Sequence, residues 1–102
     1  MTASDVSALV HTAAHELGLT LRRGEGDAIV ELARRESGFD PNCRTGSHYG
    51  LWQIAVKLHG LKWPMTRLEQ AMWVIPYCRS KKFGRRIEVW YSRGNYDRRR
   101  SF

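Results

Sequence analysis

Glu36 stands where a proton-transferring carboxyl group could act, at the end of a helical pattern and directly before a loop rich in glycine and aromatic residues. Breaking the bond between two sugars requires a proton on the leaving oxygen, and a carboxylic acid held near apolar side chains can supply it. The negative end of a helix dipole also suits an acid. Glu36 is therefore the candidate acid. The alternative is an ordinary exposed helix carboxylate beside Arg34 and Arg35.

Two short blocks begin and end this segment of the chain. Residues 36–42 read ESGFDPN and residues 49–54 read YGLWQI. In order and spacing they resemble the E-S-G-F-x-P and G-L-x-Q-I blocks of the lysozyme-like lytic transglycosylases, which are related to goose-type lysozymes. The resemblance implies a small lysozyme-like helical domain with a sugar-binding cleft. It further implies that Glu36 is the sole catalytic acid and base and that Gln53 and Ser37 line the cleft.

A third set of residues extends the resemblance to about residues 27–96. Its parts are Leu68–Ala71, Phe83–Gly84 and Val89–Tyr96. Gln70 stands where many family members have asparagine, which is a departure from the family pattern.

Two tyrosines in the last of these parts are candidates for the cleft. Tyr91 lies three residues before Gly94, as the tyrosine of the family's Y-N-A-G motif does, although Ser92 and Arg93 replace the Asn-Ala of that motif. The resemblance implies that Tyr91 and the nearby Tyr96 contact substrate. The alternative for both is a tyrosine of the core or of the cleft rim.

The activity implied by the resemblance is cleavage of the β-1,4 bond between N-acetylmuramic acid and N-acetylglucosamine in peptidoglycan, without a cofactor. If the muramyl 6-hydroxyl attacks, an anhydro sugar forms and the enzyme is a lytic transglycosylase; if water attacks, it is a muramidase. A glycosidase with two carboxylates needs the second one roughly 5–10 Å from the first. Asp40 is the nearest in sequence, but the loop around it favours a capping role.

Aromatic residues next to Gln53 suit a carbohydrate site, because flat rings stack on the apolar faces of sugars. Tyr49 and Trp52 are the best placed of these rings. Trp63, just before Pro64, is a candidate platform at the cleft rim. Trp73 lies inside a helical pattern and is better interpreted as core.

The histidines and cysteines do not predict a metal site. Cys43, His48 and His59 match none of the compact Cys/His spacings, so no metal is expected. Cys43 and Cys78 are expected to be reduced thiols, since the chain shows no export signal.

The net charge of +7 is unevenly distributed. Residues 1–56 hold five Lys or Arg against seven Asp or Glu, and residues 57–102 hold twelve against three. A basic half attracts polyanions, and both a bacterial wall and nucleic acid qualify. A nucleic-acid-binding domain and a non-catalytic wall-binding module are therefore alternatives. No nucleic acid is expected as partner, because a nucleic-acid-binding domain would leave the Glu36 and Gln53 blocks unexplained.

The expected partner is the peptidoglycan glycan strand, and the expected state is a monomer. No apolar run approaches the roughly 20 residues that cross a membrane, and the first residues lack the pattern of a signal peptide. Action on a bacterial cell wall would then require delivery by a phage lysis system, by a virion, or as part of a larger protein.

The periodicity predicts an all-α fold, with residues 1–102 as one domain and a basic tail at 97–102. A first helix capped by Ser4 ends near Gly18, and a turn at Gly24–Gly26 leads to the helix that carries Glu36. The further helices are expected at residues 49–59, from Thr66 with a kink or break at Pro76, and at residues 85–92.

Overall fold

Three helices of 12 to 14 residues form the body of the protein. The computed structural model describes residues 1–81, 83–92 and 101–102, and for residues 90–92 it describes the backbone alone. The order of elements is α1 (Ala3–Glu16), α2 (Glu25–Ser37), β1 (Arg44–Thr45), β2 (His48–Tyr49), α3 (Arg67–Cys78) and α4 (Ile87–Ser92). Most of the described structure is helical, as the predicted all-α fold requires, but the two strands were not expected.

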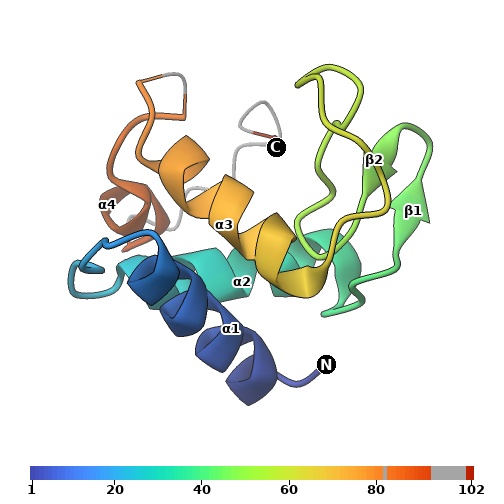
Figure 1. Cartoon of the computed structure of the whole chain (residues 1–102). Helices are drawn as coiled ribbons and strands as arrows, with labels where there is room; N and C mark the ends of the chain where they lie inside the picture. Colours follow the sequence, from blue (N-terminus) through green and yellow to red (C-terminus); the bar gives the residue numbers. More distant parts are fainter. Residues whose placement is uncertain (82, 93–100) are drawn as a thin grey trace.

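The helices pack as neighbours in the order α3, α1, α2 and α4. Helix α1 lies against both α2 and α3, and α4 contacts α2. Figure 1 shows the β-hairpin and its following loop at one end of the molecule and α4 at the other. Helix α2 therefore joins the two ends. Within the described residues, no helix has the length and apolar character needed to cross a membrane.

Local sequence signals explain most helix ends. Thr66 caps α3 by accepting a hydrogen bond from the Glu69 N–H, while the Glu69 carboxylate accepts one from the Thr66 N–H, as the sequence predicts. The same arrangement joins Thr2 and Asp5 at the start of α1, so Thr2 is the cap and the prediction of Ser4 is wrong. Helix α3 continues past Pro76 to Cys78, so this proline falls in its last turn.

The core gathers buried apolar side chains from the three longer helices and from the loop between β2 and α3. They include Val10, Ile29, Leu51, Ile54 and Ile75. Trp73 packs against this core as expected, with its ring stacked on Tyr77. The two cysteines are free thiols, and Cys78 is fully buried in the core.

The segment at residues 49–59 is not a helix, contrary to the prediction. After β2 it forms turns, with a single bridge between Tyr49 and Ile54. Gly50 and Gln53 both have a positive φ, of 85° and 52°, which a right-handed helix does not allow. Leu58, predicted on the apolar face, is 77% exposed. The apolar spacing that indicated a helix arises instead from a compact loop that buries Leu51 and Ile54.

A short β-hairpin precedes this loop. β1 and β2 pair in antiparallel fashion, with Arg44 opposite Tyr49 and Thr45 opposite His48. Gly46 has a φ of 61° in the turn between them. With two residues in each strand, the hairpin gives no alternating pattern that a sequence could reveal.

Candidate functional site

Glu36 lies in the last turn of α2 and is half-buried, at the position that the sequence predicts. The helix ends at Gly38, whose left-handed backbone donates a hydrogen bond to the Arg34 carbonyl at 2.9 Å. The Ser37 hydroxyl donates to the Ala33 carbonyl at 3.1 Å and accepts from the Asp40 N–H at 3.2 Å. Ser37 therefore stabilises the helix end, and its contact with a sugar stays a prediction.

Asp40 caps the loop that follows. Its side chain is exposed, and its Oδ1 accepts a hydrogen bond from the Asn42 N–H at 2.9 Å. The predicted capping role is confirmed. This bond gives the carboxylate a local structural task.

Gln53 is held in an unusual state. Its backbone is left-handed, and its side chain is 5% exposed. The amide Nε2 donates to the Cys43 carbonyl at 3.1 Å and to the Gly50 carbonyl at 2.9 Å. The buried Oε1 has no hydrogen-bond partner among the described residues. Backbone strain and an unsatisfied buried acceptor are both typical of functional sites.

Trp52 is a core residue. Its side chain is 0% exposed, and its Nε1–H donates to the Ile29 carbonyl of α2 at 2.9 Å. The prediction that Trp52 stacks on a sugar is wrong, because no face of the ring reaches the surface. The ring instead fixes the second sequence block to the helix that carries Glu36.

Tyr49 stays available as a partly exposed ring. It is half-buried, and its ring lies 5.2 Å from that of Trp63, measured between centroids.

The predicted cleft roles of Tyr91 and Tyr96 fall outside the described side chains. Within the described part of the chain, no three His, Cys, Asp or Glu side chains are grouped so as to hold a metal ion.

Gln70 connects three segments around this region, a role that the sequence did not indicate. Its Oε1 accepts the Leu51 N–H at 2.9 Å, and its Nε2 donates to the carbonyls of Pro41 and Met65 at 3.3 and 3.2 Å. The side chain is 1% exposed. One amide therefore fixes the loop after Glu36, the loop of Gln53 and the approach to α3. The available signal was a glutamine within an apolar helix, where buried polar groups need partners.

The lack of a side chain at Gly50 leaves room for the Gln70 amide, and replacing Gly50 tests the role of Gln70. A Cβ at this position would collide with Oε1 of Gln70, and the φ of 85° is itself unfavourable for other residues. We expect Gly50→Ala to lower the free energy of unfolding by about 2 kcal/mol or more. Gly46→Ala is the control, since it shares a positive φ but meets nothing within 4 Å, and should cost about 1 kcal/mol. Urea unfolding measures both, and equal losses would contradict this role of Gln70.

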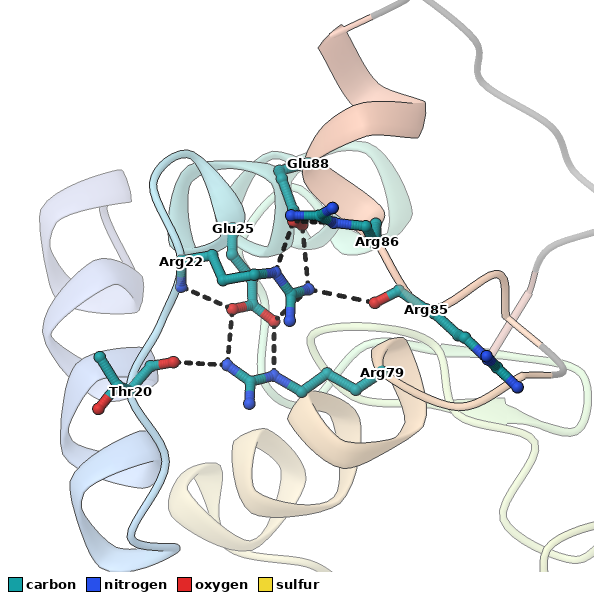
Figure 2. Close-up of polar contacts among 7 residues, drawn as sticks. All are labelled: Thr20, Arg22, Glu25, Arg79, Arg85, Arg86 and Glu88. Atoms are coloured by element: carbon teal, nitrogen blue, oxygen red, sulfur yellow. Dashed lines mark hydrogen bonds and ion pairs between the residues drawn. The ribbon is translucent and has the colours of Figure 1, made fainter.

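A buried ion-pair network holds the other end of α2 (Figure 2). Glu25, in the first turn, is 0% exposed and receives two hydrogen bonds of 2.8 Å from the Arg79 guanidinium. Its carboxylate also accepts from the Arg22 N–H at 2.9 Å. Arg79 additionally donates to the Thr20 carbonyl at 2.7 Å. The sequence predicted a turn at Gly24–Gly26, whereas Glu25 and Gly26 begin α2 and are buried.

Arg22 extends the network to α4. Its Nε donates to Glu88 at 2.6 Å, and its Nη2 donates to both Glu88 and the Arg85 carbonyl. Figure 2 shows Arg22 lying between the two carboxylates. The network thus joins the start of α2, the end of α3 and the start of α4, and it steadies the helix whose far end carries Glu36.

The two carboxylates of the network have lowered pKa values. Burial by itself raises the pKa of Glu25, but the hydrogen bonds from Arg79 and Arg22 and their positive charges outweigh it. For Glu88, the hydrogen bond from Arg22 is the main cause of the lowered pKa. Both groups are therefore ionised in the folded protein under conditions where an ordinary glutamate would begin to take up a proton.

These pKa directions predict acid sensitivity. A carboxyl group with a lowered folded-state pKa contributes stability above its unfolded pKa, near 4.5, and that contribution is lost as pH falls through the folded value. We expect the melting temperature to hold from about pH 7 to pH 5 and to fall progressively below it. Thermal unfolding followed by circular dichroism measures this. A melting temperature that rises on acidification would contradict the assignment.

Comparison of the chain with known protein families, with curated proteins and with solved structures finds no match. The assignment of function therefore rests on the residues of this chain and on their arrangement.

Proposed function

We propose that the protein cleaves the β-1,4 bond between N-acetylmuramic acid and N-acetylglucosamine in peptidoglycan, with Glu36 as the sole acid and base. The observation that carries the proposal is the state of Gln53. A strained backbone and a buried, unpaired Oε1 are costly, and proteins retain such features where a site requires them.

The hydrogen bonds that hold the two sequence blocks together also support this proposal. The Gln53 amide holds the Cys43 carbonyl, directly after the block that begins with Glu36, and Trp52 holds the Gln53 block to α2. Both blocks therefore share one rigid support, which acid–base catalysis needs. Because Asp40 is bonded within its own loop, the proposed mechanism uses one carboxyl group.

The proposed reaction has two steps at Glu36. The protonated carboxyl group donates its proton to the glycosidic oxygen, while the acetamido group of the substrate stabilises the positive charge on the sugar. The resulting carboxylate then removes a proton from the nucleophile. With the muramyl 6-hydroxyl as nucleophile, the enzyme is a lytic transglycosylase; with water, it is a muramidase. We favour the transglycosylase on the strength of the sequence blocks, and we place its action on the bacterial cell wall.

The test is digestion of purified peptidoglycan by the wild type and by Glu36→Gln, with mass spectrometry of the released muropeptides. Products lighter by one water than reducing muropeptides, absent with the variant, support a transglycosylase. Reducing ends support a muramidase. If the wild type binds the wall but releases nothing, the proposal of an enzyme is wrong, and a wall-binding module takes its place.

A further inference from the structure

At the hairpin, Tyr49 contacts both Arg44 and Trp63, and the three side chains are called here the Arg44–Tyr49–Trp63 stack. Arg44 and Tyr49 are opposite each other in the two strands, and the guanidinium carbon lies 4.8 Å from the centre of the Tyr49 ring. The Tyr49 ring also lies beside the Trp63 ring, with the two ring planes inclined by 35° and their centroids 5.2 Å apart. A cation over an aromatic face is attractive, so the hairpin register itself builds the first contact.

The stack is held in place by the backbone around it. Tyr49 exchanges two hydrogen bonds with Ile54, of 3.0 and 2.8 Å. The Trp63 ring lies against Gly50, where even a Cβ would approach it to 3.1 Å. The Arg44 Nε donates to the Gly46 carbonyl at 3.2 Å. Both rings are half-buried, so each is fixed while part of it remains exposed. Such preorganised rings lose little freedom on binding a ligand.

Arg44 differs from the paired arginines of the helices. Arg22 and Arg79 contact Glu25, and Arg34 contacts Glu31. Arg44 is exposed and has no acidic partner within ion-pair distance among the residues that the structure describes. The guanidinium carbon lies over the Tyr49 ring, and the N–H groups of a guanidinium form a planar array that fits a carboxylate.

The stack adjoins the candidate site. The Cys43 carbonyl, one residue before Arg44, accepts the Gly50 N–H at 2.7 Å and the Gln53 amide at 3.1 Å. Arg44 follows Cys43 and Tyr49 precedes Gly50, so each is one residue in sequence from a carbonyl that holds the Gln53 amide.

We propose that the Arg44–Tyr49–Trp63 stack is a subsite for a carboxylate-bearing muramyl unit. The Tyr49 and Trp63 rings would contact the apolar face of the sugar, and Arg44 would pair with the carboxylate. Two groups supply this chemistry: the lactyl carboxylate of muramyl units without peptide, and the free carboxylates of a stem peptide. The inference rests on the proposed function, since it takes the ligand to be a wall glycan.

The test is calorimetric binding in the Glu36→Gln background, which keeps the glycans intact. The probes are chitin oligomers without carboxylates, peptide-free oligomers of alternating N-acetylglucosamine and N-acetylmuramic acid, and the same oligomers carrying stem peptides. Arg44→Gln should weaken binding of carboxylate-bearing probes about 5- to 10-fold and leave chitin binding unchanged. Arg23→Gln, an exposed arginine elsewhere, should change neither.

The pattern of loss identifies the carboxylate. A loss with peptide-free oligomers assigns the lactyl group, and a loss confined to peptide-bearing oligomers assigns the stem peptide. Equal losses with all three probes, or no loss with any, overturn the subsite. In that case, digestion of the wall by the wild type would still support the proposed function. A wild type that releases nothing would remove the proposed function by itself, whatever Arg44 does.

Discussion

Replacement of Glu36 by glutamine should reduce peptidoglycan cleavage by about 10³-fold or more, with the fold retained. General acid–base catalysis contributes about 10²- to 10⁴-fold, and in the proposed mechanism one group performs both the acid and the base step. An amide has nearly the same shape as the carboxyl group but can neither give up nor accept the proton. Initial rates of muropeptide release measure the loss, and circular dichroism with thermal unfolding checks the fold.

Two matched variants make this result specific. Glu31→Gln changes a carboxylate on the same helix that contacts Arg34 and Arg35, and it should retain nearly full activity. Asp40→Asn removes the other carboxylate near Glu36 in sequence, and its activity should fall less than 10-fold, about what a disturbed loop cap would cause. A folded Glu36→Gln protein with wild-type rates would refute the assignment. An Asp40→Asn variant as inactive as Glu36→Gln would indicate a two-carboxylate mechanism.

Replacement of Glu25 by alanine should lower the free energy of unfolding by about 3–5 kcal/mol. The carboxylate is fully buried and is the shared acceptor of Arg22 and Arg79. Without it, Arg79 loses its acidic partner and Arg22 keeps only Glu88. Leaving a partly buried guanidinium without its carboxylate costs more than the intact pair contributes. Urea unfolding measures the change.

Glu31→Ala is the control for Glu25→Ala. It removes a half-buried carboxylate of the same helix, whose partners Arg34 and Arg35 are exposed, and it should cost less than about 1 kcal/mol. In the Glu25→Ala variant, Arg79 is left without its carboxylate. The double variant Glu25→Ala with Arg79→Leu removes that unpaired charge and should recover part of the loss. Equal losses in the Glu25 and Glu31 variants would mean that the network is not buried as described.

Features that depend on neighbouring residues could be predicted from the sequence. The capping box of Thr66 and Glu69, the position of Glu36 in the last turn of its helix and the capping role of Asp40 are all local patterns. Each is set by hydrogen bonds within four residues, so the residue types determine the outcome.

The errors arise where distant contacts decide the backbone. The apolar spacing of residues 49–59 is compatible with a helix, but Gly50 is drawn against Gln70 and Trp63, and the chain turns there. Trp52 was expected to face a sugar because it neighbours Gln53. Its direction is set by the Ile29 carbonyl, 23 residues away. The network of Glu25 joins residues separated by more than 50 positions, and no local pattern indicates it.

The contacts of Gln70 also constrain the order in which the chain can acquire its shape during synthesis. The segment from Pro41 to Met65 leaves the ribosome before Gln70 does, and it contains three of the backbone groups that this side chain binds. Until α3 follows, those groups lack the side chain that they contact in the folded protein. The loop that contains Leu51 therefore completes its contacts only when α3 docks, after the helix that bears Glu36 has been synthesised.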